Sequence, residues 1–412
     1  MDTLISIEEA RARLLSVSKP SRVTQATLMS SYDLILAQDI VSRVDTPPFD
    51  RAMLDGFAVR AADVQSSDAQ QPTVLQVIGD AFAGTGSLPD VSPGTAVRTM
   101  TGARLAPGAD AIVRLEWARE TQGGDGQRIV SIFRSVRSEE AVQRRGEGGG
   151  DGQLLAQAGH RLTPLTIGRL AAQGLAVVDT YDQPVVGVMT VGDELAGAGV
   201  PLLDGQVYDS NSAMLCALIQ ATGAKARFFG SSGDDAEVMQ RMLHAALKEC
   251  DALITIGGVS VGDRDLTPAT LEALGAKRLF WGVWMRPGTP VYAASYQGKP
   301  VLACSGNPFA AWVNAVLLAW PMVESLQGLT SGSRQWTIPA RIRSVPPLRR
   351  LKHTRFLQAT LIRDENVWWA DVSGSHSSAL IPHGSTVQGL VRIDASQEVQ
   401  EGDWVEVLFT QM

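Results

Sequence analysis

Cysteine and histidine are scarce in this chain of 412 residues. The three cysteines, Cys216, Cys250 and Cys304, lie far apart among apolar residues. This placement favours buried free thiols and argues against a disulfide framework. The five histidines are scattered, and no Cys/His cluster has the spacing of a zinc site, so the sequence gives little support to a histidine-based metal centre.

Long hydrophobic runs are also rare. The N-terminal stretch "MDTLISIEEARARLL" has no basic segment before an apolar one, so it predicts an amphipathic helix rather than a secretory signal. The most apolar stretch, residues 309–323, is interrupted by Asn314 and Pro321 and is shorter than the ~20 residues that cross a bilayer. We expect a buried core helix there, no membrane partner, and a cytoplasmic protein.

Positive charge is not in excess, because the formal net charge is −7. Such a chain has no general attraction for nucleic acid or for an anionic membrane, so neither is expected as a partner. An anionic ligand would have to be held by local groups. The apolar fraction of 45% is typical of a globular protein, and the length predicts two to four domains.

The pattern of predicted helices and strands changes along the chain, and it predicts a multidomain α/β plus β fold. Residues 1–43 and 137–180 are expected to form a helical and linker domain, with helices at "SIEEARARLLS", "ATLMSSYDLILAQDI" and "TPLTIGRLAAQGL". Residues 44–136 contain short β-type runs between Gly/Pro turns, which indicates a separate, mostly-β lobe. Strands alternate with helices in residues 181–330, which predicts an α/β domain with a mostly parallel sheet. Residues 331–412 contain only short strands and predict a small C-terminal β-barrel.

Four predicted strands of the α/β region end in polar loops, at residues 190–195, 230–235, 257–265 and 304–308. Ligands of open α/β sheets bind at the carboxyl ends of the strands, so these loops are expected to converge on one edge. Their backbone N–H groups and hydroxyls suit a phosphate. The candidate binding residues are Gly257, Gly258, Ser260, Gly262, Ser305, Gly306 and Asn307.

Carboxylates stand in the same loops and suit Mg²⁺, which prefers oxygen ligands. The candidates are Glu194, Asp234, Asp235, Asp263 and Asp265. Each feature also has a plainer explanation. Asp234 and Asp235 precede a helix, and for that pair alone helix capping is favoured. Asn307-Pro308 can simply begin a helix, and the glycine turn is not a P-loop, because no G-K-[ST] follows it. The four loops together are more specific than any one of them.

A set of motifs in a fixed order identifies a family resemblance. These are "PPFDRAMLDGFAVRAAD", "RTMTGARLAPGADAIVRLE", "RRGE", "VGDEL", "GQVYDSN", "GGVSVGDRD", "PGTP" and "SGNP". In this order they resemble the molybdopterin molybdenumtransferases, a family that includes the C-terminal E domain of gephyrin. The resemblance covers nearly the whole chain, and the combination is highly specific although no single motif is.

The resemblance implies a homodimer of four-part subunits whose α/β region is a molybdopterin-binding domain. It implies a transferase of molybdenum cofactor biosynthesis that inserts molybdate into adenylyl-molybdopterin and releases AMP, with Mg²⁺ as cofactor. The sequence does not decide between molybdate and tungstate. Molybdopterin adenylyltransferase is a candidate partner.

Residue by residue, the matching motifs imply catalytic roles for Asp55, Thr101, Glu194, Asp265 and Arg286. Asp55 stands in the lobe that the family extends across its dimer, and Glu116 ends a strand of the same lobe. Arg355 and Ser375 resemble the arginine and serine near molybdate. Metal roles are implied for Glu194, for Asp234 or Asp235, and for Asp265.

The chain also departs from the family pattern. The usual "KPGKP" is "RPGTP" here, so Arg286 and Thr289 replace two lysines, and "RRGED" ends in Gly148 instead of aspartate. Arg51 and Met53 stand beside Asp55, and Ser305 replaces the proline before "GNP". A divergent, non-catalytic relative that binds the pterin nucleotide or a partner protein is therefore an alternative. A nucleotide hydrolase is another, although the β lobe and barrel count against it.

Overall fold

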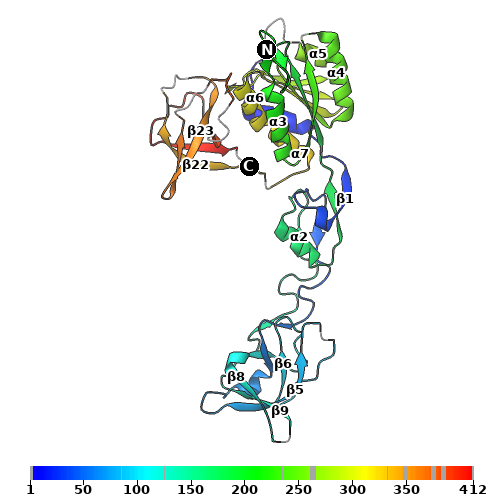
Figure 1. Cartoon of the computed structure of the whole chain (residues 1–412), viewed down its shortest axis with the longest axis vertical. Coiled ribbons are helices and arrows are strands. Elements are labelled where there is room, and N and C mark those ends of the chain that lie inside the picture. The colour runs from blue at the N-terminus through cyan, green and yellow to red at the C-terminus, as the bar shows by residue number, and fades with distance from the viewer. Residues whose placement is uncertain are drawn as a thin grey trace. The chain divides into compact units, whose positions relative to one another are not determined.

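A computed structural model describes residues 3–84, 86–124, 126–233, 235–259, 266–331, 333–346, 351–372, 377–381 and 387–410. The chain divides into two compact units. The first consists of Met1–Gln38, Ala158–Thr163 and Val177–Met412, and the second of Asp39–Gln157 and Pro164–Ala176. Figure 1 labels the main elements of both units.

The first unit is built on a six-stranded sheet with the order β16-β13-β17-β21-β20-β18. Its strands are β13 (Val185–Val191), β16 (Lys225–Ser232), β17 (Ala252–Ile256), β18 (Lys277–Trp281), β20 (Tyr292–Tyr296) and β21 (Lys299–Cys304). The first four in the order are parallel to one another, whereas β20 and β18 join antiparallel at one side. The predicted mostly parallel sheet is thereby confirmed.

Helices cover both faces of this sheet (Figure 1). They are α1 (Ile7–Val17), α3 (Ser210–Ala221), α4 (Ala236–Glu249), α5 (Thr267–Ala273), α6 (Pro308–Asn314) and α7 (Trp320–Leu326). Val186 and Val188 of β13 pack with α1, α3, α6 and α7, while Met189 and Val191 pack with α4 and α5. Alternate residues of a strand point to opposite faces, so a strand covered on both sides is apolar throughout.

The apolar stretch at residues 309–323 forms a buried core helix, as the sequence predicts. A π-helical segment (Ala315–Ala319) connects α6 to α7, and the whole run, Pro308–Leu326, is long and apolar enough to cross a membrane. However, 83% of its apolar window is buried inside the protein. It begins at Asn307 with Pro308 in the first turn, as the sequence predicts.

The predicted helix over "ATLMSSYDLILAQDI" is wrong. Val23–Thr27 form strand β1, which pairs antiparallel with β12 (Val177–Tyr181), and only a 3₁₀ turn (Leu28–Ser30) follows. Asp33 then adopts φ of 69°, which ends any right-handed helix. The apolar residues Leu28, Ile35 and Leu36 are buried at helix-like spacing, which explains the error.

A five-stranded barrel completes the first unit. Its strands are β22 (Thr337–Ser344), β23 (Thr354–Asp364), β24 (Val367–Asp371), β25 (Gly389–Ile393) and β26 (Trp404–Phe409). The order β23-β24-β22-β26-β25 closes on itself because β25 also pairs with β23. The predicted C-terminal barrel is confirmed. A short strand of the α/β domain, β19 (Met285–Arg286), pairs parallel with the start of β23. A small ladder, β14 (Leu195–Ala196) with β15 (Val207–Tyr208), lies after β13.

The second unit contains the predicted mostly-β lobe. Its six-stranded sheet has the order β7-β4-β6-β5-β9-β8. The strands are β4 (Gly56–Val59), β5 (Thr73–Ala81), β6 (Thr95–Thr99), β7 (Ala111–Arg114), β8 (Ala118–Gln122) and β9 (Arg128–Ile132). Two-stranded ladders, β3 (Arg51–Ala52) with β10 (Val142–Gln143) and β2 (Ile40–Val41) with β11 (Leu154–Ala156), and helix α2 (Pro164–Ala171) complete the unit. Two 3₁₀ turns, Ala61–Val64 and Leu115–Trp117, flank the sheet strands.

Candidate functional site

The described parts of the four predicted polar loops lie at one edge of the parallel sheet. They follow β13, β16, β17 and β21, which are adjacent and parallel, so their carboxyl ends lie together. The loops also contact one another directly. The Gly192 N–H donates to the Ser232 carbonyl over 2.9 Å, and the Gly257 N–H donates to the Cys304 carbonyl over 3.0 Å.

Glycine is required in the loop after β17 by packing alone. Gly257 has φ of 96°, and a Cβ there would lie 2.3 Å from the Val191 carbonyl oxygen. Gly258 has φ of 65°, and its Cβ would lie 2.6 Å from Oγ1 of Thr267. These glycines therefore let the loops approach closely. Their roles in binding a phosphate stay predictions.

The start of α3 adds a residue that sequence reasoning missed. Thr190 at the end of β13 donates to the Asp209 carboxylate over 2.9 Å, and Asp209 caps α3 by accepting from the Ser212 N–H. Asn211 then donates from Nδ2 to the Gly306 carbonyl over 2.7 Å. Its Oδ1 is buried and has no hydrogen-bond partner among the described residues. The only sequence signal for Asn211 was its place in the "YDSN" motif.

Two of the five candidate metal ligands lie in the described part of the chain. Glu194 is exposed in the turn after β13. Asp235 caps α4, because its Oδ1 accepts hydrogen bonds from the N–H groups of Glu237 and Val238, each with a length of 2.9 Å. The capping explanation therefore accounts for Asp235. The other predicted site residues on masked positions, Asp234, Ser260, Gly262, Asp263, Asp265 and Ser375, lie outside the described residues.

The described residues do not form a complete metal-binding site. Among the residues of the described ranges, no group of three or more His, Cys, Asp or Glu side chains is placed to hold a metal ion. Mg²⁺ often binds through one or two carboxylates together with substrate phosphates and water. The predicted magnesium site accordingly stays a prediction.

A cleft of about 890 Å³ lies beside this sheet edge, and we call it the arginine cleft. Its walls come from the "RPGTP" loop, from the loop after β21, and from the barrel. The lining residues include Arg286, Thr289, Ser305, Asn307, Arg355, Ser377 and Ser378. The Phe309 N–H at the start of α6 donates to the Ser378 carbonyl over 3.0 Å, which fixes the barrel to this wall.

Two arginines of this cleft sit in register on paired strands. Arg286 of β19 stands opposite Arg355 of β23 in the parallel ladder. Burial, and then the charge of Arg286, lower the pKa of the Arg355 guanidinium. Neighbouring like charges raise the free energy of a site, and an anion bound between them relieves that repulsion. The sequence predicted both residues but not their pairing.

His353 precedes Arg355 by two residues and is sensitive to the charge of this pair. Its ring packs against Trp284, with ring centroids 4.8 Å apart. Burial, and next the charge of Arg286, lower the pKa of His353 below its ordinary value of 6.5. The imidazole is therefore neutral at pH 7. Because its pKa responds to Arg286, His353 reports on the charge of the arginine cleft.

Thr289 stands where the family pattern has its second lysine. Its hydroxyl donates to the Met285 carbonyl, and its own carbonyl accepts from the Val283 N–H over 3.1 Å. The side chain therefore closes its own loop instead of presenting a charge. The arginine cleft has one cation fewer than the family pattern implies.

The second unit brings two predicted catalytic residues together. The N–H and the hydroxyl of Thr101 both donate to Oδ1 of Asp55 over 2.7 Å. These two hydrogen bonds, backbone first, and then the charge of Arg98 lower the pKa of the Asp55 carboxyl. Asp55 is thus ionised at pH 7. Glu116 lies in the 3₁₀ turn that follows β7.

Of the remaining departures from the family pattern, three make local hydrogen bonds and one is exposed. Arg51 donates from Nε to the Gln143 side chain over 2.8 Å. Met53 is exposed. Gly148, where the family has aspartate, donates its N–H to the Thr46 carbonyl over 2.8 Å. Ser305 is buried with its N–H donated to Asn314.

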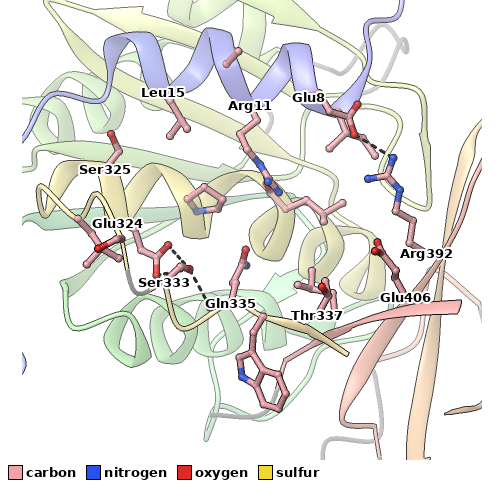
Figure 2. Close-up of a pocket in the computed structure, with 18 of the residues that line it drawn as sticks. Glu8, Arg11, Leu15, Glu324, Ser325, Ser333, Gln335, Thr337, Arg392 and Glu406 are labelled. Carbon is pink, nitrogen blue, oxygen red and sulfur yellow. Dashed lines mark hydrogen bonds and ion pairs between the residues drawn. The ribbon is translucent and has the colours of Figure 1, made fainter. Parts of the chain in front are cut away.

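A second cleft, of about 870 Å³, is lined by α1, α7, the barrel and residues of the segments 329–331 and 333–337 (Figure 2). Figure 2 shows that Arg392 of the barrel reaches Glu8 of α1, over 3.1 Å. Arg11 donates to the Leu317 carbonyl over 3.1 Å. Most polar side chains of this cleft form hydrogen bonds or ion pairs with other residues of the chain. We therefore interpret the cleft as a packing interface between the barrel and the helices.

Comparisons with known proteins bear on this site. Residues 5–174 match the profile described as the MoeA N-terminal region (domain I and II), and residues 187–325 match the probable molybdopterin binding domain. The chain is 35% identical over 323 residues to the molybdopterin molybdenumtransferase of Bacillus subtilis, covering 78% of this chain and 75% of that one. The chain belongs to the molybdopterin molybdenumtransferase family.

Other relatives agree with this membership. The Haemophilus influenzae molybdopterin molybdenumtransferase is 32% identical over 343 residues, covering 83% of this chain and 81% of that one. A solved structure of the molybdopterin biosynthesis MoeA protein from Pyrococcus horikosii is 28% identical, covers 99% of both chains and gives a TM-score of 0.80. The protein is thus a transferase of molybdenum cofactor biosynthesis with a MoeA-like fold.

Proposed function

We propose that this transferase inserts molybdate into adenylyl-molybdopterin and releases AMP. The observation that carries the proposal is the arginine cleft beside the carboxyl edge of the parallel sheet. Arg286 and Arg355 stand side by side in register there, and their charges suit a doubly charged oxyanion. The glycine loop after β17 follows a strand of this edge, and its backbone N–H groups other than that of Gly257, which donates to the Cys304 carbonyl, would hold a pyrophosphate.

Each part of the site has a chemical task in this proposal. The arginines hold molybdate, together with N–H and hydroxyl donors of the loop after β21, so that the oxyanion lies next to the pterin dithiolene. Asn307 and Ser305 line the same cleft. Gly257 and Gly258 shape this edge by packing closely against Val191 and Thr267, and Gly306 lies in the loop that would meet the nucleotide. In the second unit, Asp55 is ionised and is oriented by Thr101, as its predicted catalytic role would require.

Magnesium belongs to the same proposal. Glu194 fits a site of the kind that uses one or two protein carboxylates plus phosphate oxygens, because it is exposed at the loop edge. Bound Mg²⁺ would neutralise charge on the pyrophosphate and make AMP a better leaving group. Asp235 is the weaker candidate because its carboxylate already caps α4. We further propose a homodimer in the cytoplasm, a setting consistent with three free cysteines.

The test is AMP release by the purified protein with adenylyl-molybdopterin, Mg²⁺ and molybdate. We expect release that requires molybdate, and tungstate in its place measures the choice of oxyanion. Glu194→Gln should raise the Mg²⁺ concentration that gives half-maximal release, whereas an unchanged requirement would remove Glu194 from the metal role. Release that is independent of molybdate would favour a nucleotide hydrolase instead.

A non-catalytic relative remains the second candidate function, and one observation favours it. Thr289 is engaged within its own loop where the family pattern has a lysine. Such a protein would bind adenylyl-molybdopterin and hold it for a partner, for which molybdopterin adenylyltransferase is our candidate. Tight binding of the pterin nucleotide without AMP release would establish this alternative.

A further inference from the structure

Asn314 is a polar residue in the most apolar helix of the chain, and it is completely buried. Its two amide atoms reach two different loops. Oδ1 accepts from the Ser305 N–H over 3.2 Å, and Nδ2 donates to the Gly288 carbonyl over 2.9 Å. Ser305 and Gly288 both line the arginine cleft. One side chain therefore connects two walls of that cleft.

The loop that carries Arg286 is shaped around this amide. Gly288 has φ of 95°, and a Cβ there would lie 2.5 Å from Nδ2 of Asn314. Only glycine allows the backbone to approach the amide so closely. The contact is therefore built from both sides, by a glycine in the loop and by an asparagine in the helix.

The helix changes its geometry directly after Asn314. The π-helical segment Ala315–Ala319 follows, and such insertions are frequent at functional sites. A π segment leaves carbonyls without their usual helical partners. Here Arg11 donates to the Leu317 carbonyl and Gln335 donates to the Val316 carbonyl. Both donors lie in the second cleft, as Figure 2 shows, so neighbouring segments stabilise the irregular helix that presents Asn314.

We propose that Asn314 is a positioning residue that sets the distance between the "RPGTP" loop and the loop after β21, and thereby the oxyanion affinity of the arginine cleft. The inference rests on the proposed function in one respect, namely that the anion is molybdate. Asn314 itself does not line the cleft among the described residues, so it acts through Gly288 and Ser305. A substitution that removes the Asn314 amide removes both hydrogen bonds to these loops but changes none of the side chains that line the cleft.

The test compares Asn314→Leu with a matched control, Val313→Ala. Val313 is equally buried, precedes Asn314 in the same helix and does not line the arginine cleft. Both variants disturb the core, but only one removes the link. We expect Asn314→Leu to weaken molybdate binding, measured by calorimetry on the full-length protein, at least ten-fold. Val313→Ala should change it less than two-fold.

A second variant addresses the possibility that Asn314→Leu does not fold. Gly288→Ala introduces a methyl group against the same amide from the loop side, without changing the helix. It should weaken molybdate binding in the same direction. Equal effects of Asn314→Leu and Val313→Ala, or an unchanged affinity in Gly288→Ala, would overturn the inference.

A readout that needs no ligand separates this inference from the proposed function. The pKa of His353 responds to the charge of Arg286, so NMR titration of its imidazole reports where the "RPGTP" loop lies. Asn314→Leu should shift this pKa, and Val313→Ala should not. If the wild type fails to bind molybdate but the shift occurs, the proposed function fails and the positioning role stands. If no shift occurs, the positioning role fails.

Discussion

Replacing Arg286 by glutamine removes one of the two paired guanidinium groups from the arginine cleft. A hydrogen bond between charged partners contributes about 1.5–3 kcal/mol when it is well shielded. Arg286 is exposed, and solvent screening reduces this contribution to about 1–2 kcal/mol. We therefore expect Arg286→Gln to weaken molybdate binding by about 5- to 30-fold, because each 1.4 kcal/mol is a factor of ten.

The same substitution should not destabilise the fold. Burial, and then the charge of Arg286, lower the pKa of Arg355, so removing Arg286 takes away a like charge that opposes the Arg355 guanidinium. Thermal unfolding should give a midpoint equal to or above that of the wild type. A residue with a purely structural role would show the opposite pattern, a loss of stability together with any loss of binding.

The pH dependence follows from His353. Its pKa is below 6.5 in the folded protein, so the unfolded state binds the proton more readily. The stability that depends on a neutral His353 is complete above pH 6.5 and is lost as the pH falls toward the folded-state pKa. Without Arg286 the pKa of His353 should rise, so this loss should become smaller. NMR titration of the imidazole measures the shift directly.

The matched control is Arg363→Gln. Arg363 lies on the same strand, eight residues beyond Arg355, which places it about 26 Å away at ~3.3 Å per residue. That distance exceeds the Debye length of about 8 Å at physiological salt. The control should change neither molybdate affinity nor the pKa of His353. Equal molybdate affinities for wild type and Arg286→Gln, with an unchanged His353 titration, would refute the reasoning.

Three further predictions concern residues of the site and its surroundings. Thr289→Lys adds a cation to the arginine cleft, so it should tighten molybdate binding by about 3- to 10-fold in calorimetry. It should also speed AMP release. If neither binding nor release changes, the lost lysine is compensated elsewhere. Asp235→Ala should lower the free energy of unfolding by about 1 kcal/mol in urea titration, as loss of a helix cap does, and should leave the Mg²⁺ requirement unchanged; a higher requirement would restore Asp235 as a metal ligand. Thr101→Val should raise the pKa of Asp55, as followed by carboxyl NMR. The stabilisation that depends on ionised Asp55 is present above its unfolded-state pKa and disappears as the pH falls through its folded-state pKa, so wild type and variant should differ in stability at pH 7 and converge in acid.

The sequence predicted the layered architecture where local patterns and tertiary packing agree. Short apolar runs that end in glycine turns are strands of the parallel sheet, and capped amphipathic runs such as that after Asp209 are helices. The prediction failed at residues 26–40, where helix-like apolar spacing arises in irregular backbone. There the pairing of β1 with β12, far away in sequence, overrides the local preference.

For the candidate site, motifs predicted which residues gather but not how they contact. The convergence of four loops follows from strand order in a parallel sheet, so it could be anticipated. The register that pairs Arg286 with Arg355 depends on contact between two domains, which no local pattern encodes. Asn314 was visible only as an interruption of an apolar run. Its meaning depends on Gly288 and Ser305, which lie elsewhere in the chain and become its neighbours through folding.

The pairing of β19 with β23 has a consequence for how such enzymes can be divided and recombined. The barrel contributes Arg355, so a chain cut after the α/β domain would keep only one of the two paired arginines. Exchanging barrels between related enzymes should therefore transfer anion preference together with the exchanged piece. If the proposed function holds, the C-terminal barrel supplies one half of the oxyanion-binding site and the α/β domain supplies the other.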